Sequence, residues 1–130
     1  QMIFVCLLSA VTMWRRMIFL QVKFTNKGST LVISIIGEID HHSAEYIRDK
    51  IDAQMMKSTT RNIVFDLSRV GFMDSSGIGV VVGRYKNISK LDGKAAIVNP
   101  NAQIRKILEI SGIQRIIPIF GSVDEAISSM

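Results

Sequence analysis

Two short segments hold the residues with the greatest chemical potential. Residues 37–42 read "GEIDHH" and combine two carboxylates with two imidazoles, while residues 73–79 read "MDSSGIG" and place a carboxylate beside two hydroxyls. Each segment follows an apolar run of the strand type. These residue types support nucleophilic catalysis, phosphate binding, metal binding or covalent modification, and each of these chemistries requires a particular spacing.

The spacing argues against a serine nucleophile. The nucleophile elbow of hydrolases reads G-x-S-x-G, whereas residues 73–77 read M-D-S-S-G and lack the first glycine. A nucleophilic serine also needs a base. The two histidines of the chain, His41 and His42, are adjacent, and such a pair in a loop is more typical of a solvated or capping position. The sequence therefore predicts no catalytic residue and no enzyme activity.

The glycines after the serines do not form a phosphate-binding loop. Gly77, Gly79 and Gly83 have the spacing G-x-G-x-x-x-G, which matches neither the Walker pattern nor the dinucleotide fingerprint. We expect these small residues to let a helix lie close to the sheet. No nucleotide or other cofactor is predicted from this pattern.

Metal binding has equally little support. Asp40, His41 and His42 carry suitable ligand atoms, but three consecutive residues rarely converge on one ion, and the chain has no C-x-x-C or H-x-x-x-H pattern. The single cysteine, Cys6, excludes an intramolecular disulfide and is compatible with a reducing, cytoplasmic environment.

A helix cap and a modification site remain for the "MDSSG" segment. Asp74 is a favourable N-cap, which places Ser75 and Ser76 in the first turn of the following helix. Asp74 alone suffices as the cap, so capping does not explain why two serine hydroxyls follow it in the first turn. A phosphate there would add about −1.5 to −2 charges at a helix N-terminus, where the helix dipole tolerates them.

The composition and charge limit the classes of partner that are expected. The 130 residues carry a net charge of +5, with 48% hydrophobic and 21% charged residues, and no run of five or more lysines and arginines. One packed domain is expected, and direct nucleic-acid binding is not, because phosphate backbones require clustered cations. Residues 1–16 differ in composition from the rest and are interpreted as an N-terminal extension that is dispensable for the core. Their apolar run is too short to span a bilayer, which takes about 20 residues. An upstream start is the preferred interpretation of these residues, with a peripheral membrane or partner-binding helix as the alternative; no membrane partner is expected for the domain itself.

Strand and helix patterns alternate from Met17 onward. The patterns predict strands at 18–24, 30–39, 62–67, 94–99 and 115–120, a turn at 26–28, a connection at 68–74, and helices around 44–55, 75–92, 100–111 and 122–130. Gly37 and Asp40 are expected to end the second strand, Asn99 to cap the third helix with Pro100 in its first turn, and Gly112 to end it. The second helix should bury a stripe formed by Ile78, Val81, Val82, Tyr85 and Ile88.

This order predicts an α/β domain with a mixed, mostly parallel sheet of about five strands and about four helices. Function in such sheets collects in loops after the carboxyl ends of strands. Residues 38–42 and 73–76 both follow strands, so we expect these two loops to lie close together.

The same segments carry a family resemblance. "IIGEIDHHSAEYIRDKI", "NIVFDLSRVGFMDSSGIGVVVGRYKNI" and "ILEISGI" resemble the STAS domain family of bacterial anti-sigma factor antagonists, from about residue 17 to the C-terminus. "GEIDHH" together with "GRYK" is similar to the stage II sporulation (SpoIIAA) type. The resemblance implies a STAS domain at residues 17–130; residues 1–16 have no counterpart in it.

The resemblance also implies a mechanism. Family members bind, when unphosphorylated, an anti-sigma factor that is a serine kinase, and so release its sigma factor. The kinase then phosphorylates the antagonist, and a serine phosphatase reverses this. By position, Ser75 corresponds to the phosphoacceptor. The partner-binding residues implied are Gly37, Glu38, Asp40, His41, His42, Asp74, Ser76 and Gly77.

Two other functions stay open. A STAS domain can serve as the regulator of a membrane transporter, which would require a preceding multi-span region. It can also act as a small-molecule or nucleotide-binding module that uses the same loops.

Overall fold

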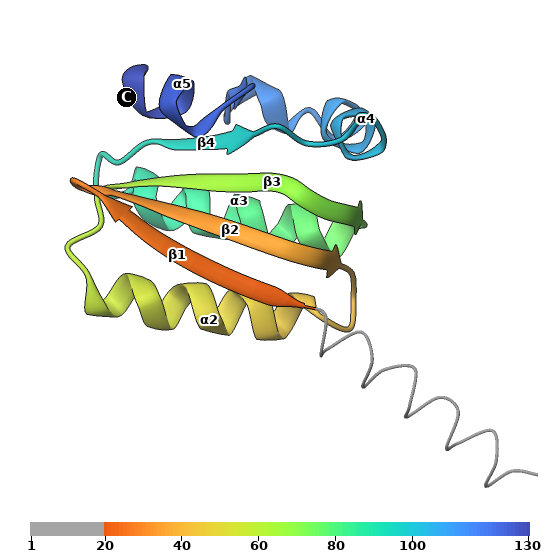
Figure 1. Cartoon of the computed structure of the whole chain (residues 1–130), viewed down its shortest axis with the longest axis horizontal. Coiled ribbons are helices and arrows are strands. Elements are labelled where there is room, and N and C mark those ends of the chain that lie inside the picture. Colours follow the sequence, from red (N-terminus) through yellow and green to blue (C-terminus); the bar gives the residue numbers. More distant parts are fainter. Residues whose placement is uncertain (1–19) are drawn as a thin grey trace, which may run out of the picture.

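The computed structural model describes residues 20–130, which form a five-stranded sheet covered by helices (Figure 1). The strands are β1 (Gln21–Lys27), β2 (Thr30–Ile39), β3 (Asn62–Met73), β4 (Ala95–Val98) and β5 (Ile119–Phe120). The helices are α2 (Ala44–Lys57), α3 (Ser75–Ser89), α4 (Ala102–Ser111), the short 3-10 helix η1 (Ile113–Arg115) and α5 (Val123–Ser128). The predicted fold class is confirmed.

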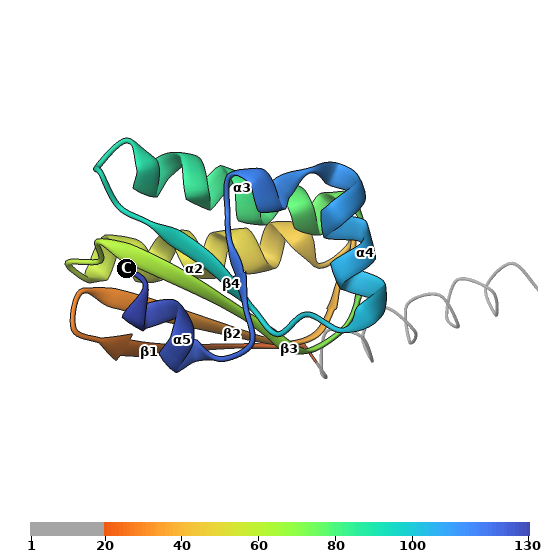
Figure 2. The same cartoon turned by 90° about the horizontal axis from the view of Figure 1, so that it is seen from above.

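The order of the strands in the sheet is the same as their order in the chain, β1-β2-β3-β4-β5. β1 runs antiparallel to β2, and the other neighbouring pairs are parallel. Helices α2 and α3 lie on one face of the sheet, and α5 lies on the other (Figure 2). The parallel pairs follow from the β-α alternation. Each parallel pair needs a crossover that returns the chain to the end of the sheet at which the previous strand began.

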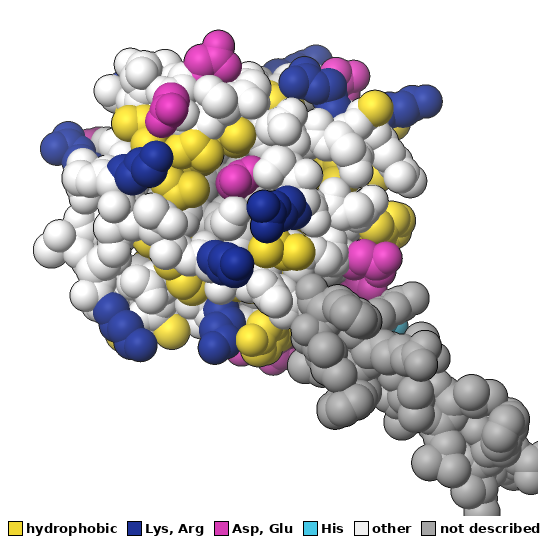
Figure 3. All heavy atoms as spheres, viewed as in Figure 1, with side chains coloured by type: hydrophobic (Ala, Val, Ile, Leu, Met, Phe, Trp, Pro, Cys, Tyr) yellow, Lys and Arg dark blue, Asp and Glu magenta, His cyan; other side chains and the backbone are white. Residues whose placement is uncertain are grey.

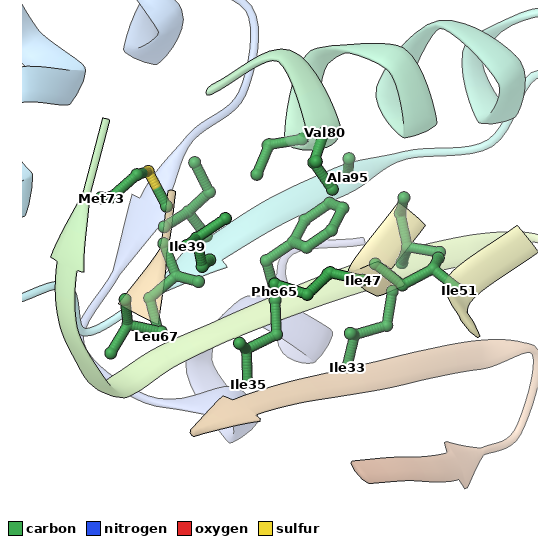
Figure 4. Packing of buried hydrophobic residues seen from close by; sticks show 14 of the residues in the cluster. Ile33, Ile35, Ile39, Ile47, Ile51, Phe65, Leu67, Met73, Val80 and Ala95 are labelled. Atoms are coloured by element: carbon green, nitrogen blue, oxygen red, sulfur yellow. The ribbon is translucent and has the colours of Figure 1, made fainter. Parts of the chain in front are cut away.

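The main core lies between the sheet and the helices α2, α3 and α4. Phe65 at its centre is fully buried, and isoleucine side chains of β2 and α2, among them Ile35 and Ile47, lie around it (Figure 4). A smaller cluster on the opposite face includes Val32, Val64 and Ala126 of α5. The central strands are therefore buried on both faces where this smaller cluster lies, as the nearly continuous apolar run of residues 30–39 predicts, and are half-buried on the α5 face beyond it.

The sheet face that carries α5 is only partly covered. Figure 3 shows lysine and arginine side chains spread over this face, with hydrophobic patches between them. At its centre the Asp66 carboxylate accepts hydrogen bonds from Ser34 Oγ at 3.2 Å and Ser68 Oγ at 2.7 Å. These contacts satisfy the carboxylate in a polar part of the sheet, where Ser34 and Asp66 are half-buried and Ser68 is exposed.

Several predicted boundaries are wrong. β1 continues to Lys27, which pairs with Thr30, so the turn consists of Gly28 and Ser29, and Gly28 has a φ of +64°. The part of the predicted first strand before residue 20, like the predicted extension at residues 1–16, lies outside the described residues. Residues 68–73 are part of β3 and not a connection, because Val70 and Met73 are buried against β2.

The third helix starts later than predicted. Its cap is Asn101, whose Oδ1 accepts from the Ile104 N–H at 2.8 Å, while Asn99 has a φ of +48° and Pro100 precedes the helix. Gly112 ends the helix at φ +77°, as predicted. The predicted strand at 115–120 shrinks to β5, since Pro118 has no N–H for the ladder.

Candidate functional site

The site forms where β2 and β3 end side by side. Ile39 of β2 pairs with Met73 of β3, so the chain leaves both strands at the same edge of the sheet. The backbone N–H of Asp74 also donates to the Ile39 carbonyl at 3.2 Å. The expected closeness of residues 38–42 and 73–76 is therefore confirmed.

The Asp74 carboxylate joins the two loops. Its Oδ1 accepts from the Ser76 N–H at 2.8 Å, which makes Asp74 the N-cap of α3 as predicted. Its Oδ2 accepts from the His41 N–H at 3.2 Å, 33 residues earlier in the chain. One side chain thus fixes both the start of α3 and the position of the histidine loop.

The two serines differ in exposure. Ser75 is the first residue of α3 and is exposed, whereas Ser76 is half-buried and its N–H is bonded to Asp74. No residue among 20–130 forms a hydrogen bond with the Ser75 hydroxyl. The Ser75 side chain is therefore the more accessible of the two hydroxyls at a helix N-terminus, where the backbone dipole favours negative charge.

The histidine loop is built around Asp40. The Asp40 side chain is buried, and its Oδ1 accepts from the N–H groups of His42 at 2.9 Å and Ser43 at 3.0 Å. Ser43 Oγ in turn donates to the Glu38 carbonyl at 2.8 Å. Asp40 is thus a loop-forming residue and not a surface ligand, and Ser43 is a structural residue that sequence reasoning missed. A serine three residues after an aspartate is a usable signal for such a turn.

The two imidazoles lie on the surface of this loop. His41 and His42 are both exposed, with ring centroids 5.7 Å apart in an edge-to-face arrangement. Within residues 20–130 no group of three or more histidine, cysteine, aspartate or glutamate side chains could hold a metal ion. The two rings form an exposed polar and aromatic surface.

Gly37 and Glu38 occupy an irregular part of β2. Gly37 has a φ of +125°, and the register with β3 shifts between Gly37 and Glu38, so Gly37 forms an irregularity inside β2. The strand ends at Ile39, directly before Asp40, which confirms the predicted bounds of 30–39. Glu38 is exposed and pairs with Phe72, whose ring is 38% exposed. Phe72 was missed because its segment was interpreted as a connection.

Of the three glycines in α3, only Gly77 contacts the sheet closely. A Cβ atom at Gly77 would lie 2.5 Å from Met73 Cγ and 2.9 Å from Ile39 Cγ2, whereas one at Gly79 or Gly83 would meet nothing within 4 Å. The packing explanation is therefore confirmed for Gly77 and wrong for the other two. Of the predicted stripe, Val81 and Ile88 are buried, while Ile78, Val82 and Tyr85 are half-buried and pack against the main core. The buried positions also include Gly77, Val80 and Arg84, which the pattern did not predict.

Arg84 has an ion-pair partner on the neighbouring helix. The side chain is 9% exposed, and its Nε lies 3.0 Å from Asp52 Oδ1 of α2. This pair connects the helix that carries Ser75 to the helix that follows the histidine loop. Breaking it would leave a buried unpaired charge.

The STAS domain model matches residues 21–126. The chain belongs to the STAS domain family. It is 32% identical over 111 residues to the anti-sigma F factor antagonist of Paenibacillus polymyxa, covering 85% of this chain and 95% of the relative. It is 40% identical over 84 residues to the same-named protein of Lysinibacillus sphaericus, covering 65% and 72% of the two chains.

Solved structures agree with this STAS assignment. The unphosphorylated form of the anti-sigma factor antagonist SpoIIAA superposes with a TM-score of 0.71 at 33% identity, covering 85% of this chain and 94% of that chain. The phosphorylated form of the Bacillus SpoIIAA superposes with a TM-score of 0.65 at the same identity, covering 85% and 97%. Within residues 20–130, no helix has both the length and the hydropathy needed to cross a bilayer.

Proposed function

We propose that this STAS protein is a cytoplasmic anti-sigma factor antagonist whose binding is switched by phosphorylation of Ser75. Its partners are an anti-sigma factor with serine-kinase activity and a serine phosphatase. The observation that carries the proposal is the Asp74 carboxylate, which holds the histidine loop and the start of α3 together and leaves Ser75 exposed beside them.

The partner-binding surface comprises the exposed residues of this junction. Glu38, His41 and His42 contribute charge and polar aromatic area, and Ser75 contributes the hydroxyl. Asp40, Asp74 and Gly77 act indirectly, because their contacts fix the two loops and the close approach of α3 to the sheet. Gly37 supplies the bulge that places Glu38 on the surface, and Ser76 completes the first helical turn.

A phosphate on Ser75 would change the surface and leave the fold intact. It would add about −1.5 to −2 charges next to Asp74, where the α3 N-terminus tolerates them. At an interface that closes over Ser75, a buried unpaired charge costs on the order of 2–5 kcal/mol. A tenfold loss of affinity corresponds to roughly 1.4 kcal/mol, and this cost is larger, so the phosphorylated form should dissociate from the kinase.

The test combines phosphorylation and binding. The purified chain is incubated with candidate kinase anti-sigma factors and ATP, and the peptide containing residues 72–79 is examined by mass spectrometry. Ser75→Ala should bind the kinase and resist phosphorylation, while Ser75→Asp should bind at least about tenfold more weakly. Ser76→Ala is the matched control and should still be phosphorylated. Circular dichroism verifies folding of each variant.

Two results would contradict the proposal. One is phosphate on Ser76 or elsewhere with Ser75 unmodified. The other is wild-type affinity of a folded Ser75→Asp variant for a kinase that binds the unmodified chain. If Ser75 is phosphorylated but the kinase still binds equally well, Ser75 remains the phosphoacceptor and the proposed control of binding by phosphorylation is wrong.

A further inference from the structure

A cavity of about 210 Å³ lies at the end of α3 that is remote from Ser75. It is lined on one side by Tyr85 and Ser89 of α3, and on the other by Ser129 and Met130 after α5. These helices cover opposite faces of the sheet (Figure 2). Ala95 and Ala96 of β4 also line the cavity, so it lies beside β4, between the two helix ends. Along α3, at 1.5 Å per residue, it lies about 20 Å from Ser75.

The cavity exists because β5 covers only half of β4. The last two residues of β4, Ile97 and Val98, pair with β5, while Ala95 and Ala96 have partners only on the β3 side. Ile116 and Ile117 still belong to the turn after η1, since both donate to the Ile113 carbonyl. The chain therefore reaches the sheet too late to pair with the first half of β4.

Buried backbone groups of Ala95 point into this gap. The Ile63 N–H donates to the Lys94 carbonyl on the β3 side, and the Ile97 N–H donates to the Pro118 carbonyl on the β5 side. Because successive residues of a strand face alternate neighbours, the N–H and C=O of Ala95 face the β5 side, as those of Ile97 do. Ala95 is 5% exposed and lines the cavity.

Neither Ala95 group has a partner within residues 20–130. No hydrogen bond from the Ala95 N–H or to its carbonyl reaches any side chain or loop in that range. The residue positioned to donate to the carbonyl is Pro118, which lacks an N–H. In folded proteins more than 90% of buried backbone N–H and C=O groups are paired with protein or ordered water, so this donor and acceptor need a partner from outside residues 20–130.

The side chains that line the cavity indicate the chemistry of the rest of the ligand. Tyr85 and Phe120 provide aromatic surface, and Ile116 and Pro118 provide aliphatic surface. The N–H and C=O of Ala95 can bond to the C=O and N–H of an amide ligand. Paired residues of neighbouring strands exchange hydrogen bonds in the same way. A charged carboxylate fits less well, because it would accept from the N–H and repel the carbonyl.

We propose that this cavity binds a small planar molecule with an apolar ring and a carboxamide or lactam group, held by the Ala95 backbone. The site is separate from the Ser75 surface and does not depend on the proposed antagonist function. Its occupant would contact α3, β4 and the residues after α5 at once.

Benzamide is the probe, and the readout is the amide resonance of Ala95 in two-dimensional NMR of the full chain. With roughly nine non-hydrogen atoms, benzamide should bind with a dissociation constant on the order of 1 mM and shift this resonance saturably. N,N-dimethylbenzamide, which has no N–H to donate to the carbonyl, should bind at least about fivefold more weakly. This comparison requires no variant of the protein.

Ser89→Phe tests the location. Ser89 is exposed at the mouth of the cavity, so a phenyl ring there should abolish the benzamide shift without loss of fold. Asn87→Phe is the matched control, on an exposed position of the same helix that does not line the cavity, and should retain the shift. No saturable shift with benzamide, an equal shift with the dimethyl compound, or equal loss in both variants would overturn the proposal.

Discussion

The two ends of α3 are fixed by different kinds of contact. At the amino end, hydrogen bonds to the Asp74 carboxylate hold the helix start and the histidine loop, and the adjoining Ser75 side chain stays exposed. At the carboxyl end, Gly93 follows the helix at such close range to the backbone of Arg61 that a Cβ atom would lie 1.9 Å from the Arg61 carbonyl oxygen. A polar cap leaves the surface around Ser75 exposed, whereas close backbone packing fixes the path of the chain after the carboxyl end of α3.

The largest effect should come from the packed end. Gly93→Ala should destabilise the fold by about 1–3 kcal/mol, toward the upper value, because the new methyl would also lie 2.4 Å from Ile88 Cγ2 and the opposing backbone cannot move aside as a side chain can. Denaturant unfolding monitored by circular dichroism measures the change. A loss below about 0.5 kcal/mol would show that the two ends do not differ in packing tolerance.

The capped end should give an intermediate effect. Asp74→Ala removes the acceptor of both the Ser76 and His41 N–H groups, and we expect a loss of about 1–2 kcal/mol. Asp74→Asn retains one oxygen and should lose less. Hydrogen exchange of the His41 amide tests the loop contact separately from the helix cap. If Asp74 holds the loop as well as the helix, this exchange should be faster in both variants than in the unsubstituted chain.

The smallest effect should be a gain. Gly83 lies inside α3, where a Cβ atom would meet nothing within 4 Å, so Gly83→Ala should stabilise the fold by about 0.5–1 kcal/mol through helix propensity. Gly79→Ala should behave alike. Gly77→Ala is the contrasting variant, since its methyl would contact Met73 and Ile39. A stability loss for Gly83→Ala would mean that this glycine has a packing role after all.

The sequence predicts the elements of this fold well because hydrophobic periodicity is strong. Ile47 and Ile51 mark the buried face of α2, and the apolar run of β2 marks a central strand. It predicts strand ends poorly where a strand leaves the regular pattern. β3 continues through Ser68 and Arg69, both exposed, so the polar pair looks like a loop although Val70 and Met73 return to the core.

The site could be predicted only in part for the same reason. Asp74 as a cap is a local property of residues 74–76, and the sequence shows it. Its second bond, to His41, joins residues 33 apart and depends on the register between β2 and β3. The unpaired edge of Ala95 likewise depends on the path of residues 116–118, and no local pattern indicates it.

The coincidence of strand order with chain order has a consequence for how the protein is made. Each strand joins the edge formed by the one before it, so no strand waits for a partner that has not yet been synthesised. The β1–β2 hairpin needs only local contacts, and the β2–β3 pair closes over a single helix. The hydrogen bonds of the Asp74 carboxylate at the junction around Ser75 join residues 41 to 76, so all their donors and acceptors have been synthesised before β4 and β5 are added.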